Sequence, residues 1–198
     1  MPQQILVIHG GDSFDTYEDY LNFLKSYEIT PDKFDKHVKG GKRWKDGLQE
    51  KLGDKFDVLL PLMPCANNAR YVEWKIWLEK FFPFLKGEVI LIGHSLGGLF
   101  LAKYLSENDF PVSIKTVFLL AAPMMEGNFK LPESLEKIEQ QTKKIYLYHS
   151  ENDPVVPFAD VEKYAAKLPS AEKVIFEDKG HFIDEEFPEF VEKLKNLK

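Results

Sequence analysis

The sequence predicts an α/β fold in which a mainly parallel central sheet is covered by helices on both faces. Short runs of apolar, often β-branched residues alternate with segments whose apolar residues recur every three or four positions. The short runs are apolar at nearly every position, which is typical of parallel strands buried on both faces. The alternation predicts helical crossovers between neighbouring strands of one sheet.

Size and composition limit the classes of protein to consider. The chain has 198 residues, 44% of them hydrophobic, so we expect one globular domain over residues 1–198. Its net charge of −6 argues against nucleic acid or an anionic membrane as the main partner. No apolar run approaches the ~18 residues of a membrane span and no secretory signal follows Met1, so we expect a cytoplasmic protein. Nothing in the sequence calls for a metal or another cofactor.

The elements before the second strand follow from local patterns. The first strand is expected at residues 5–8, an unbroken run of apolar residues. Apolar residues recur at helical spacing over residues 17–24, and Thr16 can cap that helix. Residues 30–32 (Thr-Pro-Asp) predict a second helix start, since proline is favoured at the first helical position. A third helix is expected at residues 42–52, where apolar residues lie four apart.

The same two patterns define the rest of the chain. A strand at residues 56–60 is closed by proline, and a helix at 71–82 carries an aromatic stripe suited to packing on the sheet. Residues 131–140 form either a short helix or a loop. The remaining strands are expected at residues 89–92, 116–120, 145–148 and 173–176, and the remaining helices at 96–108, 157–168 and 187–197.

One strand-to-helix junction carries a chemical signature. The strand at residues 89–92 leads into Gly93-x-Ser95-x-Gly97, the spacing of a nucleophile elbow. Such a turn places the serine backbone in a strained conformation and leaves room only for glycine two residues before and after it. A glycine-rich turn with an incidental serine has the same pattern, but the strand before and the helix after it favour the nucleophile.

A base and an acid follow the nucleophile in the expected order. His181 lies just after a strand and is the best general base, while Asp153 is the best residue to orient it. The order Ser95, Asp153, His181 is that of α/β-hydrolases. Glu151 and Glu126 are rival acids. These residues predict a two-step acyl transfer from a small-molecule acyl substrate, in which His181 takes the Ser95 proton.

Further residues are expected around the nucleophile because ligands bind at the carboxyl ends of parallel strands. An oxyanion hole is predicted from the backbone N–H of Leu96 and one from Gly10 or Gly11. His9 is expected to support the site by hydrogen bonding, and the single cysteine, Cys65, to be an incidental or structural thiol. The candidates for substrate binding are His94, Met124, Trp77 and Phe182. No role is evident for His37 or His149.

The sequence resembles the compact YdeN-like, retinoblastoma-binding serine hydrolases within the α/β-hydrolase superfamily. The resemblance rests on motifs spread over nearly the whole chain: Ile8-His9-Gly10, Trp44 with Leu48 and Leu52, Leu62-Met63-Pro64, Trp74, Gly93-His94-Ser95-Leu96-Gly97, Asp153-Pro154-Val155-Val156-Pro157 and Gly180-His181-Phe182. It implies an α/β-hydrolase fold and a hydrolase of esters or related acyl compounds, with Ser95, Asp153 and His181 as the triad.

Residues 12–41 depart from that family pattern as an insertion directly after the first strand. We expect a small helical cap with Phe14, Tyr17, Tyr20 or Phe34 facing the substrate; a decoration packed to one side is the alternative. Other functions also remain open on this scaffold. These are a protein-interaction module with an inert triad, a thioesterase, a C–C hydrolase and an aminopeptidase. The sequence names no protein partner.

Overall fold

The computed structural model describes residues 1–31, 33–34, 38 and 40–197. Its strands form one six-stranded parallel sheet in the order β2-β1-β3-β4-β5-β6, which confirms the predicted fold class. The strands are β1 (Gln3–Ile8), β2 (Phe56–Leu59), β3 (Glu88–His94), β4 (Ser113–Leu120), β5 (Thr142–Ser150) and β6 (Glu172–Phe176).

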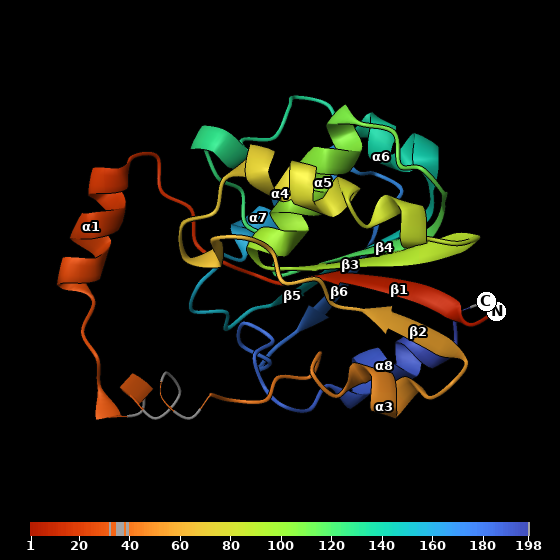
Figure 1. Cartoon of the computed structure of the whole chain (residues 1–198), viewed down its shortest axis with the longest axis horizontal. Helices are drawn as coiled ribbons and strands as arrows, with labels where there is room; N and C mark the ends of the chain where they lie inside the picture. The colour runs from red at the N-terminus through yellow and green to blue at the C-terminus, as the bar shows by residue number, and fades with distance from the viewer. Residues whose placement is uncertain (32, 35–37, 39, 198) are drawn as a thin grey trace.

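Helices cover both faces of the sheet (Figure 1). One face carries α4 (Tyr71–Glu79), α5 (Leu96–Glu107), α6 (Glu136–Gln141) and α7 (Ala159–Lys167). The other carries α3 (Leu48–Leu52) and α8 (Pro188–Lys195). Short 3₁₀ turns lie at Ala66–Asn68, Phe82–Phe84 and Gly127–Phe129. Within the described residues, no helix is long and apolar enough to span a bilayer.

The two faces of the sheet explain the unbroken apolar runs. Along β1, Leu6 and Ile8 belong to the core beneath α4 and α5, while Ile5 and Val7 belong to the core beneath α3 and α8. All four side chains are at most 1% exposed. Because successive side chains of a strand point to opposite faces, a strand covered on both must be apolar at every position.

The helix expected at residues 42–52 is shorter than predicted. Only α3 is helical, and residues 44–47 form turns before it. Trp44 explains the difference, because its backbone N–H donates to the Asp184 carbonyl at 2.8 Å and its indole N–H to the Phe182 carbonyl at 3.0 Å. The Trp44 ring also packs edge-on against Phe190. Tertiary contacts therefore override the helical spacing of this segment.

In the predicted insertion, the helix that follows Thr16 stands apart from the domain body, whereas residues 12–14 bond to residues 66–70. Thr16 and Asp19 form a capping box at the start of α1 (Tyr17–Ser26), as the sequence indicates for Thr16. The helix has no buried residue, and Figure 1 shows it away from the sheet, on the side where β1 ends. Its aromatic residues pack mainly on each other, such as Phe14 on Phe23. The predicted cap over the substrate therefore stays a prediction.

The structure describes only part of the second helix predicted in this insertion. Pro31, Phe34 and Val38 are helical, whereas Asp32 and His37 lie outside the described residues.

Candidate active site

Ser95 lies at a strained turn between β3 and α5. Its backbone has φ 56° and ψ −127°, a conformation that non-glycine residues rarely adopt, and its N–H donates to the Leu120 carbonyl at 2.8 Å. A Cβ on Gly93 would lie 2.5 Å from the carbonyl oxygen of Gly97. A Cβ on Gly97 would lie 2.3 Å from the carbonyl oxygen of Ile8, so this glycine is required by β1 rather than by the turn itself.

Gly97→Ala is expected to lower the free energy of unfolding by about 2–4 kcal/mol, because either β1 or the turn must shift to admit the methyl group. Denaturant unfolding measures this. Gly47→Ala is the matched control, since a Cβ there meets only the Lys51 side chain, at 3.5 Å, and should change stability by less than about 1 kcal/mol. Equal stabilities for the two variants would contradict the steric argument.

Ser95, His181 and Asp153 form one hydrogen-bonded chain. The Ser95 hydroxyl oxygen lies 2.9 Å from His181 Nε2, and His181 Nδ1 lies 2.8 Å from Asp153 Oδ2. The Asp153 side chain is 0% exposed and that of His181 is 9% exposed. An acceptor carboxylate beside Nδ1 fixes the tautomer in which Nδ1 carries the proton and Nε2 accepts one. The structure thus brings together three side chains that are far apart in sequence.

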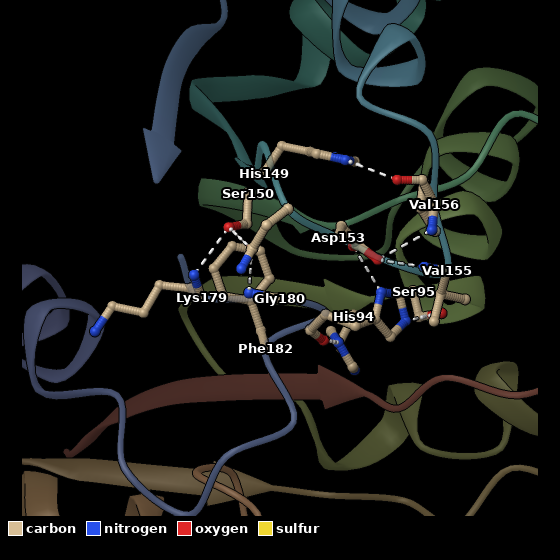
Figure 2. A network of polar contacts seen from close by, with 12 residues as sticks. His94, Ser95, His149, Ser150, Asp153, Val155, Val156, Lys179, Gly180 and Phe182 are labelled. Atoms are coloured by element: carbon tan, nitrogen blue, oxygen red, sulfur yellow. Dashed lines mark hydrogen bonds and ion pairs between the residues drawn. The ribbon is translucent and has the colours of Figure 1, made fainter. Parts of the chain in front are cut away.

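Asp153 is held as a carboxylate. Burial alone would raise its pKa, but the hydrogen bond from His181 and those from the N–H groups of Val155 and Val156 outweigh burial and hold the pKa below its ordinary value. Those N–H groups donate to Oδ1 at 2.8 and 3.0 Å (Figure 2). The rival acid Glu126 pairs with Lys130 instead, at 2.7 Å.

Two residues that the sequence reasoning missed tie the acid loop to the base loop. The Ser150 hydroxyl accepts from the N–H of Lys179 at 2.9 Å (Figure 2). It donates to Asn152 Oδ1 at 2.8 Å. Asn152 Oδ1 also accepts from the N–H of Gly180, at 2.8 Å. In the sequence, this link is indicated only by the small polar side chains that lie next to the candidate acid. It fixes the loop before His181 relative to Asp153.

His94 does not fit the substrate-binding role predicted for it. It is 2% exposed, and its Nε2 donates to the backbone carbonyl of His181 at 2.7 Å. Its Nδ1 is enclosed without a partner. Burial, with the nearby charge of His181 as a second cause, lowers the pKa of His94 to about 3. His94 is therefore a neutral residue that positions the loop of the candidate base.

The depressed pKa of His94 predicts a pH-dependent stability. The unfolded state takes up a proton near pH 6.5 and the folded state does not, so stability is full above that pH and falls as the pH falls towards 3. This residue should contribute a loss of about 2 kcal/mol between pH 7 and pH 5. We expect His94→Gln, which keeps a donor for the His181 carbonyl, to lose less stability over that range in denaturant titrations. An unchanged pH slope would contradict this.

The predicted oxyanion-hole residues lie in two segments, the start of α5 and the loop after β1. A Cβ on Gly10 would lie 3.4 Å from Ser95 Oγ, so the Gly10 backbone passes directly beside the nucleophile. Leu96 is the first residue of α5, where an N–H has no partner within the helix. Gly11 packs against the turn after β2, where a Cβ would lie 2.4 Å from the Ala66 carbonyl oxygen. Both glycines stay candidates for the second donor of the oxyanion hole.

His9 supports this loop by hydrogen bonding, as expected. Its Nδ1 lies 2.7 Å from the Gly10 carbonyl oxygen, and its Nε2 accepts from the N–H of Met63 at 2.8 Å. Burial lowers the pKa of His9, which keeps Nε2 free to accept. One neutral ring thus links the candidate oxyanion loop to the loop after β2.

The other three substrate-binding candidates have structural contacts. Phe182 is 3% exposed and stacks on Phe187 in the core beneath α8, which does not fit a substrate contact. Trp77 is 43% exposed and donates its indole N–H to the Leu62 carbonyl at 2.9 Å. Met124 is half-buried, and its N–H donates to Asp160 at 2.9 Å. Among the described residues, no cluster of three or more His, Cys, Asp or Glu could hold a metal ion.

Comparisons with known proteins identify the family of the chain. Residues 38–197 match the serine hydrolase family, so the chain belongs to that family and is a serine hydrolase with the α/β-hydrolase fold. It is 28% identical over 166 residues to serine hydrolase RBBP9 of Rattus norvegicus, a match that covers 76% of this chain and 82% of that protein.

Solved structures share the fold. The ydeN gene product of B. subtilis superposes with a TM-score of 0.76 at 18% identity, over 98% of each chain. Est1E from Butyrivibrio proteoclasticus superposes with a TM-score of 0.60 at 15% identity, over 98% of this chain and 86% of that one.

Proposed function

We propose that this serine hydrolase cleaves carboxylic esters through an acyl-enzyme intermediate on Ser95. The observation that supports this most is the hydrogen-bonded chain from Ser95 Oγ through His181 to a fully buried carboxylate on Asp153. A serine hydroxyl is a weak nucleophile until a base removes its proton, and this chain supplies a base in the correct tautomer.

The first half of the reaction forms the acyl-enzyme. Ser95 Oγ attacks the ester carbonyl carbon while its proton passes to His181 Nε2. The carbonyl oxygen becomes an oxyanion, which the N–H group of Leu96 and that of Gly10 or Gly11 stabilise. The intermediate then collapses, the carbon–oxygen bond to the alcohol breaks, and the alcohol leaves with the proton from Nε2. Asp153 stays a carboxylate throughout and balances the charge of the imidazolium.

The second half releases the acid. A water molecule gives a proton to His181 Nε2 and attacks the acyl carbonyl carbon, so that a second oxyanion forms in the same place. Its collapse breaks the bond to Ser95 Oγ, which takes the proton back. The products are a carboxylic acid and an alcohol, and the protein returns to its starting state.

A panel of p-nitrophenyl esters of increasing acyl length tests the proposal. We expect saturable release of p-nitrophenol by the wild-type chain, with a preferred acyl length, and no release above background by Ser95→Ala. Release at the same rate by both proteins would show that the hydrolysis does not use Ser95. Absence of release for every ester would direct attention to thioester or amide substrates on the same nucleophile.

A further inference from the structure

Lys45 is a buried lysine that the reaction above does not use. It is 8% exposed, in a chain whose other lysines mostly lie at the surface. The residue before it, Trp44, is 1% exposed and is tied by two hydrogen bonds to the Phe182 and Asp184 carbonyls. These bonds hold the Lys45 backbone against the loop that carries His181. The burial of Lys45 is therefore imposed by the fold.

In the part of the chain that the structure describes, the ammonium group of Lys45 has no counter-ion in direct contact, although the nearby charge of Asp46 raises its pKa. Among the described residues, its Nζ makes no hydrogen bond and no ion pair. The neighbouring carboxylate of Asp46 accepts instead from the backbone N–H of Arg43, at 2.8 Å. Nζ is also not one of the completely enclosed polar atoms that lack a partner, so it keeps some accessible surface. A buried, unpaired charge is unfavourable, and an arriving anion would relieve it.

The charge of Lys45 acts on the strand ends beside Ser95. His9 directly follows β1, and His94 is the last residue of β3. Burial is the main cause of the lowered pKa of both histidines, and the positive charge of Lys45 lowers each further. Burial, followed by the charge of Arg43, lowers the pKa of Lys45 itself to about 8, and the charge of Asp46 opposes this shift. The ammonium therefore lies within electrostatic range of both strand ends that flank the nucleophile.

We propose that Lys45 binds substrate, and that the preferred substrate is an ester that also carries a carboxylate. This inference rests on the proposed ester hydrolysis and names its substrate class. A single ammonium is a point charge, which suits one carboxylate; a doubly charged phosphate ordinarily recruits several donors or the fork of an arginine. A neutral ester of the same size leaves the ammonium unpaired.

Calorimetry on Ser95→Ala tests the assignment without turnover. Monoethyl glutarate and ethyl valerate share a five-carbon acyl chain and differ in the terminal carboxylate. We expect the glutarate hemiester to bind about 10–100-fold more tightly, the range for a hydrogen bond to a charged group. Adding Lys45→Met should abolish that preference. Adding Lys42→Met, at an exposed lysine three residues earlier, should leave it unchanged.

Three results would overturn the inference: no preference for the hemiester, the same preference after Lys45→Met, or tighter Lys45-dependent binding of monobutyl phosphate. Thermal melting checks that Lys45→Met is folded; its Tm should not fall below that of the parent, because an unpaired buried charge has been removed. Lys45→Gln is a second neutral variant and should also lose the preference for the hemiester. Turnover is measured separately on the wild-type protein. If the wild type does not hydrolyse esters, the binding measurements on the Ser95→Ala background still show whether Lys45 binds a carboxylate.

Discussion

Ser95→Ala is expected to lower kcat for ester hydrolysis by about 10⁴–10⁶-fold, the scale on which removal of a catalytic serine acts. In the proposed reaction, this hydroxyl is the group that forms the acyl-enzyme. Binding should change little, because the methylene carbon and the backbone N–H groups around it remain. Steady-state kinetics with a p-nitrophenyl ester measures the loss.

The matched control is Ser106→Ala. Ser106 lies in α5 as well, and its hydroxyl donates only to the Lys103 carbonyl, at 2.8 Å. Its kcat should stay within about twofold of wild type, since a helix-surface serine can be replaced by alanine at small cost. If the Ser95→Ala protein kept more than a tenth of the wild-type kcat, Ser95 would not be the nucleophile.

Asp153→Asn is expected to lower kcat by about 10⁴-fold while the fold is kept. The amide oxygen can still accept from the N–H groups of Val155 and Val156, but the amide nitrogen then faces His181 Nδ1. Since that nitrogen donates, it favours the tautomer with the proton on Nε2. The ring can no longer accept the Ser95 proton, so the loss should appear in kcat rather than in KM.

Glu151→Gln is the control for this change. Glu151 was the nearest rival acid in the sequence, and it is exposed at the surface. We expect wild-type kinetics from it and a near-wild-type Tm from both variants. If Glu151→Gln were the inactive protein and Asp153→Asn the active one, the assignment of the acid would be wrong.

Much of the site was accessible from the sequence because its constraints are local. Gly93 indicates a turn that admits no Cβ, Gly97 indicates close contact between that turn and β1, and the unbroken apolar strands indicate a sheet covered on both faces. Parallel strands end at one edge, so residues just after them could be expected to meet. His181 and Asp153 follow β6 and β5 in that way.

The remaining features depend on contacts between distant segments, which periodicity does not report. Phe182 follows the candidate base, yet a core of aromatic rings takes its side chain away from the substrate. Trp44 has helical spacing with Leu48, but bonds to the loop before α8 hold it in a turn. The burial of Lys45 follows from that turn, so a residue whose sequence context predicts a surface lysine is instead buried.

Labelling with a fluorophosphonate, followed by peptide mass spectrometry, tests the central claim most directly. Such a probe reacts only with a serine whose proton a neighbouring base removes. We predict one adduct, on Ser95, formed by wild type and lost in His181→Ala. An unlabelled wild-type protein, or an adduct on another serine, would contradict the claim that Ser95 is the activated nucleophile.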